Sequence, residues 1–342
     1  MNSSGARILI IAPSWVGDAV LSQPLLALLK VQDPDARIDV LAPGWVLPVY
    51  RRMPEVTDTI DSPFKHGQLG IGARLRLARQ IRQARYDRAF VLPNSFKSAL
   101  VPWLAGIPGR IGFLGELRYG LLTDARRPDD KRLPRMVERF AHLAGGSEHP
   151  LPSPLPRPAL QVGAPEVDAV LAAKGLARPD RLACFCPGAE YGPAKRWPPR
   201  YFAQLAQQLS CDGFDIWLLG SSKDAAAGAE IVRHAAGTVL DLTGKTSLDE
   251  ALVLLSIADQ VVTNDSGLMH VAAALDRPLV AIYGSSSPDF TPPLSDRARV
   301  VRLGIACSPC FERVCPLGHF DCMMRLDPER VLREIRQPAG ST

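Results

Sequence analysis

The sequence predicts an α/β protein built from two doubly wound, Rossmann-like domains. In each half of the 342-residue chain, short apolar runs alternate with segments of helical apolar spacing, a pattern typical of a parallel sheet with helices on its faces. The length also fits two domains of ordinary size. Between the two halves, residues 149–158 contain five prolines in ten positions, so this segment is expected to be a semi-rigid linker.

The first half carries three expected strands with helical segments between them. The strands are expected over residues 7–12, 37–41 and 88–92, and the helices over 19–29 and 73–85. Pro24 falls inside the first helical segment, which predicts a kink or a restart at that point. We expect an N-terminal domain of residues 1–160.

The same alternation restarts after the linker. Strands are expected over 182–186, 215–219, 239–241, 260–263 and 279–282, and helices over 199–210, 224–235, 248–257 and 268–275. The C-terminal domain is expected to span residues 161–326, with a C-terminal helix and tail over 327–342. Ligands of such sheets bind beyond the carboxyl ends of the strands, so two domains of this kind facing each other would form a cleft.

Composition narrows the functional classes. Hydrophobic residues make up 46% of the chain, which excludes a disordered protein, and no apolar run has the length of a membrane span. The N-terminus lacks the apolar stretch of a signal peptide, so we expect a cytoplasmic protein. The net charge of +5 fits an anionic substrate or membrane surface. Nucleic acid is not an expected partner, because no binding signature is present.

The segment 260–275 predicts an anion-binding turn. An apolar strand runs into Asn264-Asp-Ser-Gly267 and then into a helix, and a helix N-terminus presents unpaired N–H groups and partial positive charge. Gly267 has no Cβ, so an anion could approach the backbone closely. An ordinary capped helix after a strand is the alternative interpretation.

The loop 186–198 follows the first strand of the second domain and carries two cations. Its glycines and prolines predict an irregular backbone, and Lys195 and Arg196 precede a helix. The loop lacks the P-loop pattern. We nevertheless favour a role in binding a diphosphate over solvated surface cations, because a second anion site is expected at the same sheet edge.

The first strand leads into Gly17-Asp18 at the start of a helix. This turn is not a GxGxxG fingerprint, so an N-terminal dinucleotide site and a nucleotide-sugar epimerase are both disfavoured. The helix dipole would keep the Asp18 carboxylate ionised. The pattern alone leaves open whether Asp18 is a helix cap or a general base.

Five motifs together resemble the ADP-heptose:lipopolysaccharide heptosyltransferases. They are PSWVGDAVLSQP, PGAEYGPAKRWP, LTGKTSL, TNDSGLMHVAAAL and AIYGSSSP, and the resemblance covers roughly residues 7–335. The form of the second motif and the late cysteine cluster are most similar to the heptosyltransferase II branch. The resemblance implies the two-domain glycosyltransferase-B fold, with an acceptor-binding N-terminal domain and a C-terminal domain that binds ADP-heptose.

The resemblance also implies roles for individual residues. It makes Asp18 the catalytic base, Lys195 a ligand of the diphosphate and Asp224 the acidic residue on the ribose side. Lys245 and Thr246 would lie at the adenine. The turn near the donor sugar and diphosphate would consist of Asp265, Ser266, Gly267 and Leu268, with His270 one turn further along.

The expected reaction is an inverting transfer of L-glycero-D-manno-heptose to the first heptose of the lipopolysaccharide inner core. It would need no metal ion and no cofactor, since ADP-heptose is a substrate. The expected partners are ADP-heptose, the lipid A–Kdo–heptose acceptor and the inner leaflet of the inner membrane, to which the protein would be peripheral. A heptosyltransferase for another core position and a non-catalytic protein that binds sugar nucleotides or lipids are the alternatives.

Arginine and lysine residues of the first domain suggest where an anionic acceptor binds. One helical segment carries arginines at 74, 76, 79, 82 and 85, and more cations follow between residues 110 and 135. A solvated helix face is the favoured interpretation of the first set. For the acceptor carboxylates and phosphates we expect three residues. Lys97 ends a loop that follows an expected strand and so faces the cleft, and the guanidinium groups of Arg118 and Arg135 can bind such anions bidentately.

Four of the seven cysteines cluster late in the chain. Cys307, Cys310, Cys315 and Cys322 lie within sixteen residues, with His319 among them. Four thiols could surround a zinc ion tetrahedrally. The usual structural zinc pattern has two CxxC pairs, however, and only one occurs here. We therefore expect packed or reactive thiols, with a structural zinc site as the alternative.

Overall fold

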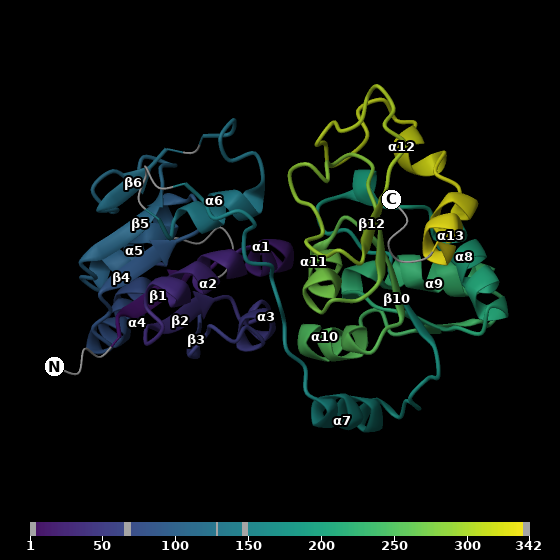
Figure 1. The fold of residues 1–342 in the computed structure, drawn as a ribbon, viewed down its shortest axis with the longest axis horizontal. Helices are drawn as coiled ribbons and strands as arrows, with labels where there is room; N and C mark the ends of the chain where they lie inside the picture. The colour runs from purple at the N-terminus through teal and green to yellow at the C-terminus, as the bar shows by residue number, and fades with distance from the viewer. Residues whose placement is uncertain (1–4, 65–69, 128, 146–149, 338–342) are drawn as a thin grey trace. The chain divides into compact units, whose positions relative to one another are not determined.

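The protein forms two compact units, residues 1–158 and 159–342, and each is an α/β unit with one six-stranded parallel sheet (Figure 1). The computed structural model describes residues 5–64, 70–127, 129–145 and 150–337. The predicted fold class of two doubly wound α/β domains is therefore confirmed. His149, the first residue of the expected linker, lies outside the described residues, and residues 150–158 form neither helix nor strand.

The sheet of unit 1 has the strand order β3-β2-β1-β4-β5-β6. Its strands are β1 (Arg7–Ile11), β2 (Arg37–Ala42), β3 (Asp58–Asp61), β4 (Arg88–Val91), β5 (Gly109–Phe113) and β6 (Asp124–Arg126). Its helices are α1 (Val16–Leu21), α2 (Gln23–Gln32), α3 (Leu47–Arg51), α4 (Ile71–Gln83), α5 (Phe96–Leu104) and α6 (Met136–His142). Helices α4 and α5 pack on one face of the sheet in a common core.

The first helical segment is broken, as Pro24 predicts. Helix α1 ends at Leu21 and α2 begins at Gln23, with Pro24 in its first turn. A proline is tolerated there because the first N–H groups of a helix have no intrahelical partner. The break lets α1 remain a short helix directly behind the end of β1.

The sheet of unit 2 has the strand order β12-β11-β10-β7-β8-β9. Its strands are β7 (Leu182–Cys186), β8 (Asp215–Leu218), β9 (Val239–Asp241), β10 (Gln260–Asn264), β11 (Leu279–Ile282) and β12 (Ala298–Val301). Its helices are α7 (Ala164–Lys174), α8 (Pro199–Cys211), α9 (Ala225–His234), α10 (Leu248–Ser256), α11 (Gly267–Ala274), α12 (Asp321–Met324) and α13 (Pro328–Arg336), with 3-10 turns at Pro193–Lys195 and Ser222–Asp224. Strands β7, β10 and β11 are buried throughout, and side chains of α8 and α13 join them in one core.

Four strands were not predicted from the sequence, and all lie toward the edges of the two sheets: β3, β5, β6 and β12. Strand β3 reads Asp-Thr-Ile-Asp, β6 has three residues, and β5 begins with Gly-Arg. Strand β12 is half-buried at the far edge of its sheet. Edge strands do not need the continuous apolar run that marks a strand covered on both faces, so hydrophobic pattern alone does not reveal them.

Both strand orders contain a point at which the direction of winding reverses. In unit 1 the reversal lies between β1 and β4, and in unit 2 it lies between β7 and β10. The loops that leave these strands diverge to opposite faces of the sheet, and the crevice between them is the usual ligand site of doubly wound folds. Asp18 and Lys97 follow the two strands in unit 1, and Lys195 and Asp265 follow the two in unit 2.

None of the helices in the described parts of the chain combines the length and the apolar character needed to cross a bilayer.

Candidate active site

The loop that follows β7 is fixed to the end of β10 by Asn264. The Asn264 side chain is fully buried; its Oδ1 accepts from the backbone N–H of Trp197 at 3.1 Å, and its Nδ2 donates to the carbonyl of Pro187 at 2.7 Å. The buried Trp197 indole donates to the carbonyl of Leu326 at 2.7 Å. Both ends of the 187–197 loop are therefore held against the sheet edge, which gives the lysine within it a defined position.

Lys195 extends from this loop to the turn after β10. Its Nζ lies 2.5 Å from Oδ2 of Asp265, and the hydroxyl of Ser286 donates to the same oxygen at 2.5 Å. The Lys195 side chain is 16% exposed and that of Asp265 only 5%. The carboxylate therefore faces its two partners rather than solvent, and the lysine is the member of the pair that a ligand can reach.

The N-terminus of α11 lies at the same turn. Ser266 precedes the helix with extended φ/ψ, and in the described part of the chain no side-chain cap bonds to its first N–H groups. Ser266, Gly267 and Leu268 are half-buried. Uncapped N–H groups and the positive end of the helix dipole attract anions, so the arrangement of α11 and Lys195 at the reversal point of unit 2 is suited to binding an anion.

His270 lies under this site and is neutral. Burial lowers the pKa of its imidazole to about 4; the nearby Asp265 acts in the opposite direction and Lys195 lowers it further. A neutral imidazole avoids placing a buried cation beside the Lys195 ammonium group. His270 is therefore a buried, uncharged group in the first turn of α11.

The ends of β8 and β9 carry the residues predicted to hold the nucleoside. The Asp224 carboxylate accepts from the backbone N–H and the hydroxyl of Ser221, at 2.9 and 2.8 Å, and it packs so closely on Gly188 that a Cβ there would lie 2.5 Å from it. Asp224 thus braces two loops of the site. Among the described residues, the buried Oγ1 of Thr246 has no hydrogen-bond partner. Lys245 is exposed and donates to the carbonyl of Asp241 at 2.8 Å.

In unit 1, Asp18 occupies the first turn of α1, beyond the end of β1. Trp15 is the residue at the N-cap position, so the carboxylate belongs to the third residue of the helix and is not the cap. Asp18 is half-buried, while Trp15 and Trp45 beside this turn are about half exposed. The Trp45 indole donates to the carbonyl of Ser14 at 3.0 Å, which joins the loop after β2 to the loop that carries Asp18.

Lys97 starts α5 at the other side of the same reversal point. It follows the β4 strand by six residues and is half-buried, and its backbone carbonyl accepts from the guanidinium of the buried Arg74 at 2.8 Å. This bond ties the first turn of α5 to α4. Asp18 and Lys97 thus both lie in the first turns of the helices that follow the two strands at the reversal point of unit 1.

Comparison with known proteins shows the family of this chain. The profile of Glycosyltransferase family 9 (heptosyltransferase) matches residues 74–321, and the chain is 49% identical to lipopolysaccharide heptosyltransferase 2 of Salmonella typhimurium, over 96% of this chain and 97% of that protein. The chain belongs to glycosyltransferase family 9, the heptosyltransferases.

The chain is more similar to a solved heptosyltransferase II than to a relative named heptosyltransferase 1. The structure of ADP-heptose lps heptosyltransferase II from E. coli superimposes with a TM-score of 0.86 at 47% identity, covering 96% of this chain and 97% of that one. Lipopolysaccharide heptosyltransferase 1 of Pseudomonas aeruginosa is 26% identical, over 96% and 97% of the two chains. The identity to the Salmonella typhimurium and E. coli heptosyltransferase II proteins is therefore nearly twice that to this heptosyltransferase 1.

One predicted acceptor residue of this heptosyltransferase is buried. The Arg118 side chain is 0% exposed; its guanidinium donates to the carbonyls of Phe113 and Pro93 and to the Asn94 side chain. Desolvation lowers its pKa to about 10. In this structure the guanidinium of Arg118 therefore holds the loops after β4 and β5 together, and its predicted contact with the acceptor stays a prediction.

The other predicted cations differ in availability. Arg135 is exposed at the start of α6 and pairs with Glu138 at 2.7 Å. On α4, Arg74 is buried over the Phe64 ring, and Arg82 donates to carbonyls of α5, so this helix uses its arginines partly for packing. The exposed Arg76, Arg79 and Arg85 fit the predicted solvated face.

Sequence reasoning missed three residues that shape the site. Ser286 holds Asp265, Asn264 joins two loops, and Trp45 reaches the Asp18 turn. The motif AIYGSSSP contains Ser286 and so gave a local signal. The roles of Asn264 and Trp45 depend on contacts between distant segments, and no local pattern reveals them.

Proposed function

We propose that this heptosyltransferase moves L-glycero-D-manno-heptose from ADP-heptose to the first heptose of the lipopolysaccharide inner core, with inversion at the anomeric carbon. The high identity to proteins named lipopolysaccharide heptosyltransferase 2 supports this choice of acceptor. The observation that carries the donor assignment is the anion site formed by Lys195 and the N-terminus of α11 at the reversal point of unit 2.

The donor diphosphate binds at this anion site. The Lys195 ammonium group and the N–H groups of Gly267 and Leu268 stabilise the negative charge that grows on ADP as the glycosidic bond breaks. Before the donor binds, the Asp265 carboxylate holds the Lys195 ammonium group in place as its counter-ion. Ser266 and His270 are the other members of this turn. No metal ion takes part in this sugar transfer in our proposal, because the protein supplies the cationic groups itself.

The nucleoside of ADP lies along the ends of β8 and β9. The unpartnered hydroxyl of Thr246 and the exposed Lys245 are available to the adenine side, and the loop braced by Asp224 lies toward the ribose. A buried polar atom without a partner is costly unless a ligand or water satisfies it, which favours Thr246 as a ligand-facing group.

Asp18 accepts the proton from the attacking hydroxyl of the acceptor. Inverting transfer needs one base and no covalent intermediate, and a carboxylate in a first helical turn stays ionised because of the helix dipole. The exposed indoles of Trp15 and Trp45 flank this turn and offer apolar faces on which a sugar ring can lie. Asp18 deprotonates the hydroxyl while the charge of the leaving group develops at the donor site.

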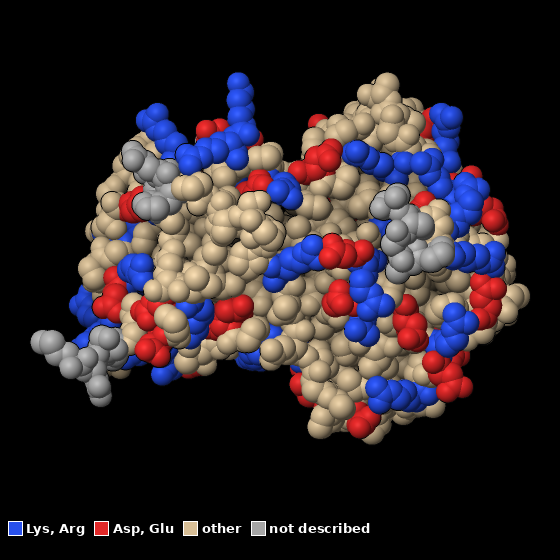
Figure 2. Space-filling model, in the orientation of Figure 1, with Lys and Arg blue, Asp and Glu red and all other residues tan. Residues whose placement is uncertain are grey.

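The acceptor and the membrane are recognised by unit 1. Lys97 and Arg135 remain the candidate ligands of the Kdo carboxylates and core phosphates. Figure 2 shows Lys and Arg side chains projecting over the segment between β6 and α6, where Arg127, Lys131 and Arg132 are exposed. Cations near an anionic leaflet contribute about 1 kcal/mol each, so we propose a cytoplasmic protein that is peripheral to the inner membrane.

The decisive experiment supplies ADP-heptose and two acceptors to the purified chain. One acceptor is a truncated lipopolysaccharide that bears a single heptose, and the other is lipid A–Kdo without heptose. Mass spectrometry should show a gain of one heptose on the first acceptor alone. A gain on the second acceptor would instead identify a transferase for another position, and binding of ADP-heptose without any transfer would indicate a non-catalytic binding protein.

A further inference from the structure

The segment between β12 and α12, residues 302–320, is a long loop without a core of its own. It contains no helix or strand, and the apolar side chains of Phe311, Val314 and Leu317 are 51, 59 and 63% exposed. Loops of this length without regular structure are uncommon inside compact domains. Small units that cannot bury apolar surface usually depend on a disulfide or a metal ion.

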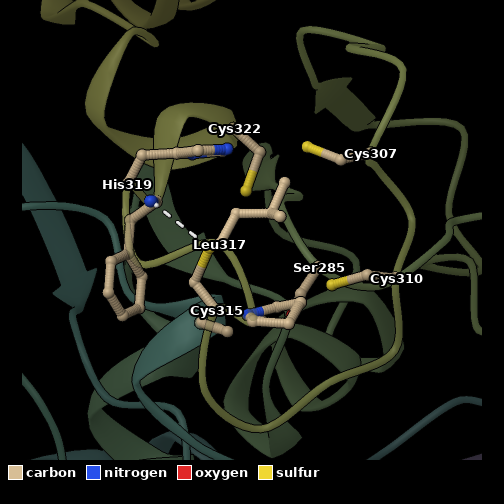
Figure 3. A pocket seen from close by; sticks show the side chains of 10 residues that line it. Ser285, Cys307, Cys310, Cys315, Leu317, His319 and Cys322 are labelled. Carbon is tan, nitrogen blue, oxygen red and sulfur yellow. Dashed lines mark hydrogen bonds between the residues drawn. The ribbon is translucent and has the colours of Figure 1, made fainter.

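The four late cysteines line a single small cavity at this loop. Cys307, Cys310, Cys315 and Cys322 surround a space of about 20 Å³, to which Leu317 and His319 also contribute. Figure 3 shows the four cysteines on different sides of this space, with the Leu317 side chain between them. A cavity of this size holds one water molecule or one ion, and all seven cysteines of the chain are unbridged.

The backbone after Cys315 turns tightly around its sulfur. The N–H of Phe320 donates to the Cys315 Sγ at 3.4 Å. Gly318 has a φ of +71°, a left-handed conformation that glycine adopts without strain. Cys315 is therefore held at a defined position on the wall of the cavity.

His319 is less suited to be a ligand than the thiols are. Its Nδ1 accepts from the backbone N–H of Asp321 at 2.9 Å, so that nitrogen is already used. The thiols of Cys307, Cys310 and Cys322 belong to exposed or half-buried side chains. The natural ligand set is therefore the four sulfurs.

We propose that Cys307, Cys310, Cys315 and Cys322 bind one thiophilic metal ion, with Zn²⁺ as the ion whose tetrahedral thiolate chemistry fits best. Among the described residues, no group of three ligating side chains already has a coordinating arrangement. Binding therefore requires the cysteine side chains to turn inward toward the cavity, which staggered rotamers of half-buried cysteines permit. The ion would then cross-link the loop.

The ion would also steady the loop that carries Lys195. Ala194 lines the same cavity, its N–H donates to the carbonyl of Arg313 at 3.1 Å, and the Tyr191 hydroxyl donates to the carbonyl of Phe311 at 2.6 Å. A Cβ on Gly192 would lie 2.3 Å from the Arg313 carbonyl oxygen, so the two loops are in close contact. This structural role, unlike the metal site, rests on the proposed function of Lys195 in donor binding.

The first test is the metal content of the full chain, purified with reductant and without chelator. Elemental analysis should find about one zinc ion per chain in the wild type and in the control Cys211→Ser, whose cysteine is exposed and outside the cluster. Cys315→Ser and Cys322→Ser should lose most of the metal. Cobalt(II) added to chelated wild-type protein should give the visible bands of a tetrahedral thiolate site, a readout that needs no variant to fold.

Three results would overturn the site. They are a wild-type chain that binds neither zinc nor cobalt, zinc that persists in both cysteine variants, and freshly purified protein in which alkylation and mass mapping find these cysteines paired as disulfides. ADP affinity is measured separately on the chelated and zinc-reloaded chain, and it should be at least several-fold weaker without metal. If zinc binds through the cysteines but ADP affinity does not change, the site stands and its support of the Lys195 loop is wrong.

Discussion

The ammonium nitrogen of Lys195 lies 2.5 Å from Oδ2 of Asp265, across a sequence distance of 70 residues. The pair joins the loop after β7 to the turn after β10, the two neighbouring strands at which the sheet of unit 2 reverses its winding. Because Asp265 is more buried than Lys195, the carboxylate acts as an internal counter-ion that keeps the lysine extended toward the anion site.

Removing the Lys195 ammonium group should weaken ADP binding. We expect Lys195→Ala to lower the affinity about 10- to 100-fold, the scale of one charge-assisted hydrogen bond, as measured by calorimetry. Arg233→Ala removes one positive charge from an exposed position on α9 and serves as the control. Equal affinities of Lys195→Ala and the control would argue against a phosphate role for this lysine.

Asp18→Asn should impair the chemical step and leave donor binding unchanged. Loss of a general base typically slows turnover about 10²- to 10⁴-fold, whereas ADP binds to groups of unit 2 in our proposal. The measurements are kcat with a saturating acceptor and ADP affinity by calorimetry. Asp35→Asn neutralises an exposed carboxylate of the same unit. Turnover of Asp18→Asn within threefold of this control would remove Asp18 from the mechanism.

His270 should make the protein less stable in mild acid. Its pKa is about 4 in the folded chain against 6.5 for the ordinary side chain, so below pH 6.5 the unfolded chain binds a proton that the native chain does not. Stability therefore falls as the pH drops from about 6.5 to 4, by up to about 3 kcal/mol for this group.

The test of this acid sensitivity is the free energy of unfolding of His270→Gln across the same pH range. The variant should be less stable overall but should show a shallower slope than the wild type. His234→Gln changes an exposed histidine and should keep the wild-type slope. Parallel curves for His270→Gln and the wild type would show that another group is responsible.

Arg118→Ala should destabilise unit 1 rather than weaken acceptor binding selectively. The substitution leaves the carbonyls of Phe113 and Pro93 without their donors, at about 1–3 kcal/mol for each buried group. The midpoint of chemical unfolding should fall clearly for this variant and stay unchanged for Arg127→Ala, which alters an exposed arginine. A normally stable Arg118→Ala with a raised KM for the acceptor alone would restore the original acceptor assignment.

The sequence was sufficient to predict the central strands and the turn between β10 and α11. Strands such as β7 and β10 are buried on both faces and therefore appear as continuous apolar runs, and the break before α2 follows from Pro24 alone. The residues that follow these strands could be assigned to the ligand-bearing edge, because parallel strands share one carboxyl edge.

The tertiary structure decided which charged residues are exposed and which are enclosed by protein. Arg118 and Arg135 carry the same group in similar sequence surroundings, yet the first is enclosed by the loops after β4 and β5 and the second is exposed. Likewise, only the folded chain brings Asn264 and Ser286 to the Lys195 loop and four cysteines to one cavity. The burial and the pairing of a charged side chain arise from contacts between segments far apart in the chain, and the local sequence pattern does not predict those contacts.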